Sequence, residues 1–480
     1  MRRYLAFDLG AESGRSLIGA LDGGKLSVEE LHRFPNEPVK AGGTMHWDVL
    51  RLWHEMRAAL ARAGDIEGIG VDTWGVDFAL LDEAGALVQN PVHYRDARTD
   101  GIPERVFSIV SRDEIYKSTG VQFMQINTLF QVFALADRHP AMLRAARHFV
   151  TIPDLLNYWL TGQITREYTN ATTTQMFDTQ ARDWARPMLE KLGLPTHILQ
   201  PVIEPGSVIG PLLPELGKAT VLAPACHDTG SAVAAIAAGG DTAFISSGTW
   251  SLLGTEAPAP IVNADAQAFN FTNEGGVGGT TRILKNIMGM WLLQGCRKQW
   301  HSTDYASLVA LAKPTPDLIS LIDPDHGSFL HPENMTAAID EFCRSTNQPV
   351  PSGQGAYVQT IFESLALKYR YVLDCLSQLT GHVYKVIRVV GGGARNSVLN
   401  QYLADATACR VIAGPVEATA LGNIVMQMVA SGAVDSVAAG REIVARSFPA
   451  QLFEPEDTGA WDDAYKRFRQ YVQSVKSASP

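Results

Sequence analysis

Two strand–turn–strand segments, one near the start of the chain and one near its middle, most constrain the fold. The apolar run Tyr4–Phe7 leads into the small and polar turn Ala11–Arg15, and apolar residues then resume. The run Thr242–Ile245 leads in the same way into Ser246–Ser251. This repeat, with Gly239–Gly240 just before its second copy, predicts two related α/β domains. We expect an N-terminal domain, a C-terminal domain and a last helix packing back on the first domain, at residues 1–240, 241–454 and 455–480.

The first turn has the composition of a phosphate-binding loop. Gly10 and Gly14 allow close approach of the backbone to a ligand, and the Ser13 hydroxyl and Arg15 suit phosphate oxygens. Asp8, at the end of the first strand, suits a hydrated Mg²⁺ ion. An ordinary hairpin with a surface arginine is the alternative interpretation.

The stretch Val221–Ala238 predicts a strand-to-helix junction with a carboxylate at its centre. Its apolar run ends at Cys226, and His227, Asp228 and Thr229 precede a helical segment of small residues. Asp228 would be an N-cap or first-turn residue, where the positive end of the helix stabilises negative charge. An ionised carboxylate there can accept a proton from a bound hydroxyl. The alternative is that Asp228 only caps the helix.

A third site candidate follows the buried-strand pattern of Ile66–Val71. Trp74 offers a flat apolar face and Gly75 lets a ligand approach the main chain, a combination that suits a sugar. Core packing is the alternative interpretation for Trp74.

The second half contains a strand that ends in glycines. Val386–Val390 runs into Gly391–Gly393, which predicts a close-approach site for a planar base or a phosphate. Leu284–Gln299 has an apolar stripe and is expected to be one helix, with Asn286 and Gln294 near the same face.

The composition argues against several classes of protein. The 480-residue chain has a formal net charge of -10 and no basic run, which argues against nucleic-acid partners. No apolar run is long enough to span a bilayer, and the first one breaks at Asp8, too early for a signal peptide. The five cysteines form no C-x-x-C pair, so we expect free thiols and a reducing, cytoplasmic location. The P-loop pattern G-x-x-x-x-G-K-S/T and a dinucleotide fingerprint are absent.

Motifs spread over most of the chain resemble those of one family. They are DLGAESGR (Asp8–Arg15), GVDTWGVDF (Gly70–Phe78), YRDAR (Tyr94–Arg98), EYTNATTTQ (Glu167–Gln175), HDTGSAV (His227–Val233), SSGTWSL (Ser246–Leu252), TNEGG with LKNIMGMWLLQ (Thr272–Gly276, Leu284–Gln294), VVGGGARNSVLNQ (Val389–Gln401) and AGPVEATALGN (Ala413–Asn423). Together they resemble the FGGY carbohydrate kinases.

The resemblance implies a two-domain α/β fold of the actin-like, ribonuclease H-like ATPase class, with a cleft between the domains. It implies transfer of a phosphoryl group from ATP, with Mg²⁺, to a primary hydroxyl of a ketose, L-rhamnulose, which gives the 1-phosphate. Asp228 is implied as the catalytic base and Asp8 as the residue near the metal. The implied ketose-binding residues are Gly75, His227, Asp228, Thr229 and Asn286. The implied ATP-binding residues are Ala11, Glu12, Ser13, Gly14, Arg15, Thr249, Gln294 and Gly392.

Two alternative functions remain at this point. Another kinase of the family, acting on fuculose, xylulose or glycerol, would share the catalytic base Asp228 and differ in the residues that contact the polyol. An actin-like assembly or chaperone ATPase would also have two phosphate-type hairpins, but it would not need the sugar-contacting residues Trp74, Gly75 and Asn286. The sequence leaves open whether the protein is a monomer or a dimer. Glu12 departs from the neutral turn of some relatives, and Ser302–Val350 carries no motif.

Overall fold

The computed structural model describes residues 1–300, 305–330 and 332–477. The chain forms two compact units, which differ from the contiguous domains expected. Unit 1 comprises Met1–Ala237, Glu256–Ile283 and Ala418–Phe448, and unit 2 comprises Ala238–Thr255, Leu284–Glu417 and the chain from Pro449 onward. Two stretches of the second half thus belong to unit 1. The later stretch does so because its helix α16 packs against β1, β6 and α9 of that unit.

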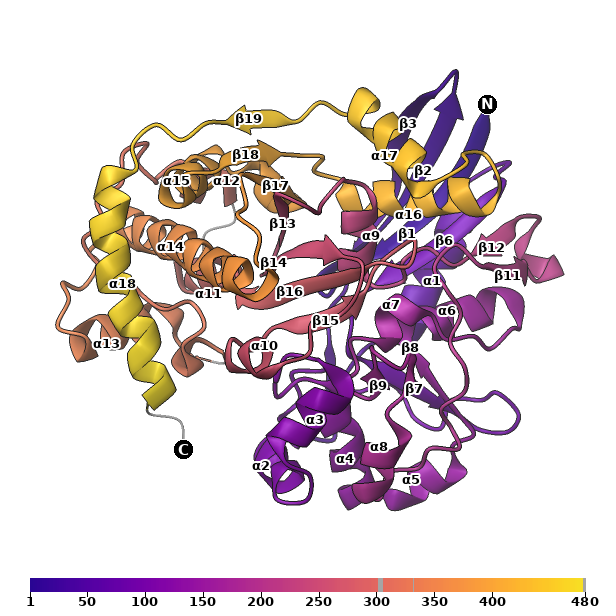
Figure 1. Ribbon diagram of the computed structural model, residues 1–480. Coiled ribbons are helices and arrows are strands. Elements are labelled where there is room, and N and C mark those ends of the chain that lie inside the picture. The colour runs from indigo at the N-terminus through magenta and orange to yellow at the C-terminus, as the bar shows by residue number, and fades with distance from the viewer. Residues whose placement is uncertain (301–304, 331, 478–480) are drawn as a thin grey trace. The chain divides into compact units, whose positions relative to one another are not determined.

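A six-stranded sheet lies within unit 1, in the order β11-β12-β6-β1-β2-β3 (Figure 1). Its strands are β1 (Arg2–Leu9), β2 (Ser13–Asp22), β3 (Lys25–Pro35), β6 (Gly68–Thr73), β11 (Val208–Pro211) and β12 (Thr220–Leu222). The hairpin predicted at the start of the chain is β1 and β2, which pair antiparallel. Since β6 pairs parallel with both β1 and β12, the carboxyl ends of three strands meet at one edge. Asp8 and Asp72 lie at this edge, and the turn that leads to Asp228 leaves from it.

Six neighbouring strands of a seven-stranded sheet repeat this arrangement in the order β16-β14-β13-β17-β18-β19, and β15 (Thr272–Gly275) pairs with β16 as the seventh strand. The six strands are β13 (Thr242–Ser247), β14 (Trp250–Ala257), β16 (Thr281–Met288), β17 (Val386–Val390), β18 (Arg410–Ala413) and β19 (Gln451–Phe453). The hairpin β13–β14 is antiparallel, β17 pairs parallel with β13 and β18, and β19 closes the edge antiparallel. The predicted internal repeat is therefore present as a repeat of strand order.

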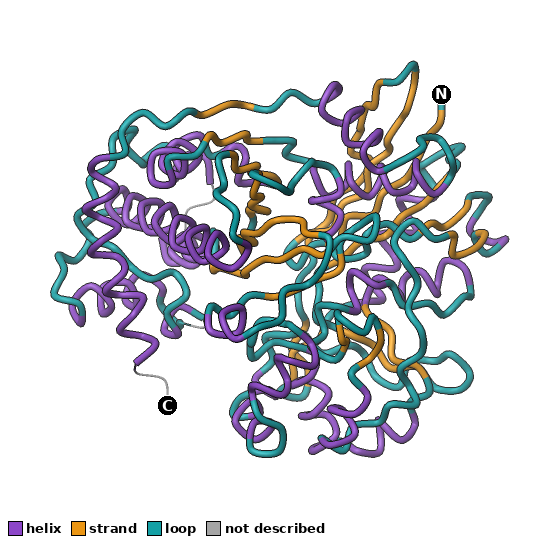
Figure 2. The backbone as a smooth tube through the Cα atoms, in the orientation of Figure 1, coloured by secondary structure: helices purple, strands orange, loops and turns teal. Residues whose placement is uncertain are grey.

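Helices flank the strands in each unit (Figure 2), and three two-stranded sheets, β4–β5, β7–β8 and β9–β10, belong to unit 1. The helices of unit 1 are α1 (Val49–Leu60), α2 (Ile102–Phe107), α3 (Arg112–Thr119), α4 (Thr128–Arg138), α5 (Pro140–Ala145), α6 (Ile152–Thr161), α7 (Tyr168–Ala171), α8 (Arg186–Lys191), α9 (Asp228–Ala234), α10 (Ala264–Ala268), α16 (Ala418–Ala430) and α17 (Val437–Ser447). Its remaining strands are β4 (Val39–Ala41), β5 (Thr44–His46), β7 (Phe78–Leu81), β8 (His148–Thr151), β9 (Phe177–Asp178), β10 (Asp183–Trp184) and β15 (Thr272–Gly275). The helices of unit 2 are α11 (Trp291–Trp300), α12 (Tyr305–Val309), α13 (Met335–Ser345), α14 (Gln354–Thr380), α15 (Ser397–Thr407) and α18 (Gly459–Ser477).

The prediction of a single helix over Leu284–Gln299 is wrong. The first part of this stretch continues strand β16, and only the second part forms helix α11. Gly289 separates the two, and a Cβ at this position would lie 2.5 Å from the side-chain oxygen of Ser251. Asn286 therefore lies on a strand and Gln294 on a helix, and the two do not share a helix face.

The last helix, α18, packs within unit 2 against α14 and α15. The Tyr465 hydroxyl donates to Asp374 Oδ2 at 2.6 Å, and the ring of Trp461 lies 5.3 Å from that of Tyr402. The expected packing of this helix on the first domain is corrected accordingly, because its buried aromatic face is covered by unit 2.

The stretch Ser302–Val350, which carries no motif, includes α12 and α13. Its residues 302–304 and 331 lie outside the described residues. The described part contributes Asp323 and Asp325, which pair with a buried lysine of α14.

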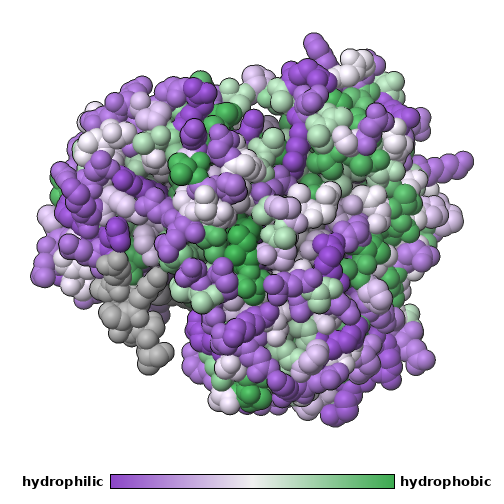
Figure 3. All heavy atoms as spheres, viewed as in Figure 1, coloured by the Kyte–Doolittle hydropathy of each residue, from purple (hydrophilic) through white to green (hydrophobic). Residues whose placement is uncertain are grey.

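The surface and the thiols agree with a globular protein. Hydrophilic side chains are spread over much of the face shown in Figure 3. Among the described residues, no helix combines the length and the apolar composition needed to cross a membrane. All five cysteines are buried free thiols, as the absence of paired spacings predicts.

Close packing of α9 on α16 fixes the helix that begins at Asp228. At Gly422 of α16, a Cβ would lie only 1.7 Å from the backbone oxygen of Ser231 in α9. That oxygen belongs to the main chain and cannot rotate away as a side chain would. The contact therefore requires glycine.

We expect Gly422→Ala to lower the free energy of unfolding by about 3 kcal/mol or more, because overpacking here displaces backbone. Gly355→Ala on α14 is the control, since its new Cβ would meet ordinary contacts of 3.5 Å and longer. Urea titrations of both variants test this. Equal stability of Gly422→Ala and the wild type would contradict the close-packing account.

Candidate functional site

The turn Cys226–Thr229 connects β12 to α9 and carries the predicted base. His227 is the N-cap residue of α9 and Asp228 is its first residue, as the sequence predicts. Oδ1 of Asp228 accepts hydrogen bonds from the Thr229 backbone at 2.6 Å and from the Thr229 hydroxyl at 3.2 Å. The Asp228 side chain is 31% exposed, whereas His227 and Thr229 are buried. The carboxylate is thus held at one oxygen and remains accessible to a ligand.

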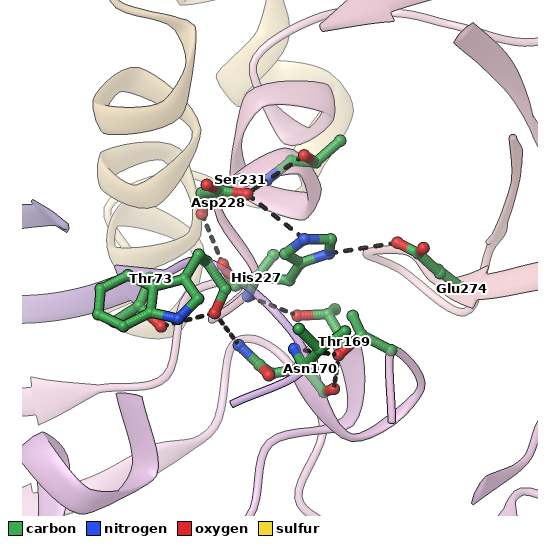
Figure 4. Close-up of polar contacts among 12 residues, drawn as sticks. Thr73, Thr169, Asn170, His227, Asp228, Ser231 and Glu274 are labelled. Atoms are coloured by element: carbon green, nitrogen blue, oxygen red, sulfur yellow. Dashed lines mark hydrogen bonds and ion pairs between the residues drawn. The ribbon is translucent and has the colours of Figure 1, made fainter. Parts of the chain in front are cut away.

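The buried carboxyl group of Glu167 binds this turn through hydrogen bonds. Oε2 of Glu167 accepts hydrogen bonds from the Cys226 backbone at 3.2 Å, the Thr169 hydroxyl at 2.6 Å and the Asn170 backbone at 3.1 Å. The Thr169 oxygen in turn accepts from the His227 backbone at 3.2 Å (Figure 4). Burial raises the pKa of Glu167 to about 8. Sequence reasoning placed these residues in a matched motif but gave them no role.

The His227 ring lies between two carboxylates (Figure 4). Its Nε2 is 3.4 Å from Asp228 Oδ1, and its Nδ1 is 3.2 Å from Glu274 Oε2. Arg282, fully buried, lies 3.2 Å from Glu274 through Nη2. Burial alone would raise the pKa of Glu274, but the neighbouring His227 and Arg282 lower it below its usual value. Glu274 and Arg282 were not identified from the sequence.

Trp74 packs in the core, which is the alternative interpretation given for it, and it does not present its ring to a sugar. The side chain is 5% exposed, and its ring lies 3.9 Å from that of Trp47. The indole N–H groups of Trp74 and Trp47 both donate to Oδ2 of Asp77, at 2.9 and 2.5 Å. Burial raises the pKa of Asp77 to about 6.

Gly75 lies in a strained turn beside Thr173. A Cβ at Gly75 would come within 3.0 Å of the Thr173 hydroxyl, which also accepts from the Val76 backbone at 3.1 Å. Val76 has a φ of 66°, which is rare for a β-branched residue. Gly75 therefore has a packing role, and its role in ketose binding stays a prediction.

Asp8 and Asp72 are adjacent across β1 and β6. Arg15 contacts Oδ2 of Asp8. Asp72 accepts from Asn423 Nδ2 at 2.6 Å through one oxygen, while its buried Oδ1 has no hydrogen-bond partner among the described residues. Burial, then the charge of Asp8, raises the pKa of Asp72 well above its usual value.

The carboxyl groups of Asp8 and Asp72 are a candidate place for Mg²⁺. Three or more His, Cys, Asp or Glu side chains do not converge as a metal site anywhere in the described part of the chain. Mg²⁺, however, typically binds one or two carboxylates and completes its shell with water and phosphate oxygens. Asp8 and the unsatisfied oxygen of Asp72 fit that requirement.

The predicted phosphate turn lies between β1 and β2. Its backbone is closed by a hydrogen bond from Gly10 N to Ser13 O at 3.0 Å. Packing explains the glycine at position 14, since a Cβ at Gly14 would lie 2.3 Å from the Phe34 ring. Glu12 is exposed, and Ala11, Ser13 and Arg15 are partly exposed.

In unit 2, the turn between β13 and β14 is hydrogen-bonded to the start of α11. The backbone N–H groups of Gly289 and Trp291 donate to Thr249 O at 3.2 and 3.1 Å. Gln294 Nε2 reaches the Thr249 hydroxyl at 3.3 Å. The structure thus brings together Thr249 and Gln294, two of the predicted ATP-binding residues.

The three glycines after β17 lie against the same turn. A Cβ at Gly391 would be 3.0 Å from Ser247 O, and one at Gly393 would be 2.0 Å from the Ser247 side-chain oxygen. A Cβ at Gly392 would meet nothing within 4 Å. Gly391 and Gly393 are therefore required by packing, whereas Gly392 faces open space.

A buried ion cluster supports this region of unit 2 and was not predicted. Lys368 Nζ lies 2.7 Å from Asp323 and 3.0 Å from Asp325. Asp325 Oδ1 also accepts from the Met288 backbone at 2.8 Å, where β16 ends. Burial alone would lower the pKa of Lys368, but the two aspartates raise it.

The predicted residues divide between the two units. Gly75, His227, Asp228, Thr229 and the turn Ala11–Arg15 belong to unit 1. Asn286, Thr249, Gln294 and Gly392 belong to unit 2.

Comparison with known proteins identifies the class. The model of the FGGY family of carbohydrate kinases matches residues 3–244 with its N-terminal domain and residues 243–431 with its C-terminal domain. The chain belongs to this family, and it is therefore a carbohydrate kinase that uses ATP.

The relatives indicate a particular activity within the class. A rhamnulokinase of Bacteroides thetaiotaomicron is 44% identical, over 98% of this chain and 100% of its own length. A rhamnulokinase of Oceanobacillus iheyensis is 41% identical, over 92% and 96%. The solved structure of ligand-bound xylulose kinase from Lactobacillus acidophilus has a TM-score of 0.80 at 14% identity and covers 100% of this chain and 99% of that one. The predicted two-domain actin-like fold class is thereby confirmed.

Glu167 gives a prediction about pH. Because its pKa is about 8 in the folded protein and near 4.5 when unfolded, the folded state retains a proton that the unfolded state loses. The free energy of unfolding should therefore fall as pH rises from about 4.5 to about 8. Glu167→Gln removes this contribution, so its stability relative to the wild type should increase by roughly 2–4 kcal/mol between pH 5 and pH 8.

Denaturant titrations at several pH values measure this difference. Glu29→Gln, at an exposed position, is the matched control for the loss of a carboxyl group at the surface. A difference between Glu167→Gln and the wild type that does not change with pH would contradict the account.

Proposed function

We propose that this protein phosphorylates L-rhamnulose with ATP and produces L-rhamnulose 1-phosphate. The observation that carries the proposal is the 40–44% identity to curated rhamnulokinases over nearly the whole chain. Unit 1 carries the proposed ketose residues Gly75, His227, Asp228 and Thr229, and Asn286 on β16 is a further proposed ligand. The buried free thiols fit a cytoplasmic enzyme.

Asp228 acts as the proposed general base. Its Oδ1 is occupied by Thr229, so Oδ2 is the oxygen that accepts the proton of the primary hydroxyl. The hydroxyl oxygen forms a bond to the γ-phosphorus as the bond to the leaving ADP oxygen breaks. Phosphoryl transfer has a loose transition state, so positioning and charge neutralisation provide most of the catalysis.

The nucleotide has proposed partners in both phosphate-type turns. The backbone of Ala11–Arg15 and the Ser13 hydroxyl are hydrogen-bond donors suited to phosphate oxygens. Thr249, Gln294 and Gly392 are the proposed contacts in unit 2. Asp8, with Asp72 beside it, would hold Mg²⁺, which neutralises phosphate charge when bound.

The test of the proposed function is ADP release that depends on L-rhamnulose, compared between the wild type and Asp228→Asn. Asparagine caps a helix about as well as aspartate, so a capping role alone predicts little change. Loss of a general base predicts a decrease in kcat of roughly 10²–10⁴-fold with ketose binding retained in calorimetry. A wild type without ketose-dependent turnover would refute the function, and near-wild-type kcat in Asp228→Asn would refute the base.

Gly392→Val tests the nucleotide site in unit 2. Since a side chain at Gly392 meets open space, the variant should fold normally and obstruct only the ligand. The KM for ATP should rise about tenfold or more, with the KM for L-rhamnulose nearly unchanged. Gly393→Ala is the contrasting variant, because its Cβ would clash with Ser247 and should lower stability. An unchanged KM for ATP in a folded Gly392→Val would exclude this placement.

A further inference from the structure

Behind Asp228, two buried residues determine which nitrogen of His227 carries its proton. Nη2 of Arg282 donates a hydrogen bond to Nδ1 of His227 at 3.2 Å. Arg282 is fully buried, and its Nε donates to Gly275 O at 2.8 Å, which fixes the guanidinium plane. A guanidinium group only donates hydrogen bonds. In this contact, Nδ1 must therefore be the acceptor.

The second contact of Nδ1 has a different geometry. Oε2 of Glu274 lies 3.2 Å from Nδ1, but it accepts no aligned hydrogen bond from the described residues. A carboxylate oxygen would require an Nδ1–H donor. The hydrogen-bond geometry is thus satisfied by Arg282 and not by Glu274, which favours an unprotonated Nδ1.

The proton of neutral His227 then lies on Nε2, which faces Asp228. A neutral imidazole carries one N–H, and the partner of one nitrogen sets the state of the other. Nε2 is 3.4 Å from Oδ1 of Asp228, the oxygen that also accepts from Thr229. Two hydrogen bonds from Thr229 hold Oδ1, and Nε2 of His227 lies beside the same oxygen, so that Oδ2 is left for the substrate.

Glu274 makes this arrangement possible by balancing a buried charge. Its Oε2 lies 3.2 Å from Arg282 Nη2, and both side chains are almost completely buried. An unpaired guanidinium in this place would be strongly unfavourable. Glu274 therefore acts on His227 through Arg282, and Arg282 acts on Asp228 through His227.

We propose that Arg282 and Glu274 are positioning residues that hold His227 in its Nε2–H tautomer, so that His227 orients the carboxylate of Asp228. This inference rests on the proposed kinase function, in which Asp228 is the base. His227 then orients the carboxylate of Asp228, and Asp228, not His227, takes up the substrate proton.

The tautomer is measured directly by long-range ¹H–¹⁵N NMR of the full chain labelled with ¹⁵N-histidine. The His227 signals are identified by their loss in His227→Gln. The wild type should show the Nε2–H tautomer. In the charge-balanced double variant Arg282→Met with Glu274→Gln, the donor to Nδ1 is gone, and the Nδ1–H form should appear.

Kinetics provide the second readout. The double variant should lose roughly ten- to a hundredfold in kcat with ketose binding retained, because it disturbs the orientation of the base and leaves the base itself in place. Arg282→Lys keeps one donor and the charge, so it should retain the Nε2–H tautomer and most of kcat.

These outcomes separate the inference from the proposed function. A wild type with the Nδ1–H tautomer overturns the inference, as does a double variant with wild-type kcat. If the double variant does not fold, the inference is still tested by the His227 tautomer of the wild type and by the tautomer and kcat of Arg282→Lys. A wild type that fails to phosphorylate L-rhamnulose instead refutes the proposed function, whichever tautomer NMR shows.

Discussion

The geometry of the site in unit 1 depends on the buried carboxyl group of Glu167. Its Oε2 accepts three hydrogen bonds, and one of them comes from the backbone of Cys226 in the turn that carries Asp228. A buried polar group of this kind is costly to leave unpaired. The turn therefore cannot move away from α7 without exposing several unsatisfied groups. The direction of Asp228 is thus set by a distant segment of the chain and not by its own helix alone.

In both units, contacts with neighbouring segments fix the turn that carries proposed ligand-binding residues. In unit 1, the turn at Asp228 is fixed from one side by Glu167 and from the other by the contact of Gly422 with Ser231. In unit 2, the turn at Thr249 is fixed by backbone hydrogen bonds from Gly289 and Trp291. Short loops at the carboxyl ends of strands can carry chemistry because rigid neighbours determine their shape.

The repeated strand order and the position of Asp228 could be predicted from the sequence because both depend on local patterns. Apolar runs ending in glycine and polar residues mark strand ends, and Asp228 precedes a run of small helical residues. The helix expected over Leu284–Gln299 failed because an apolar stretch of this length fits a buried strand as well as a helix. Pairing in the sheet decides between them, and a sequence does not show that pairing.

The supporting charges could not be predicted. Glu274 and Arg282 lie near each other in the sequence, but nothing local indicates that His227 lies between Glu274 and Asp228. Lys368 and Asp325 come from a long helix and from a stretch without a motif, and only the fold brings them together. Gly75 and Gly14 were interpreted as ligand-contacting glycines, yet Thr173 and Phe34 give both a packing reason. Such contacts are properties of tertiary structure.

The most direct test of the central claim is the specificity of the wild-type enzyme toward a panel of polyols. ADP release would be measured with L-rhamnulose, L-fuculose, D-xylulose and glycerol under identical conditions. The account predicts that kcat/KM is highest for L-rhamnulose by at least about tenfold, a difference that a few well-placed polar contacts can provide. A higher kcat/KM for any of the other three, or turnover that is independent of all four, would contradict it.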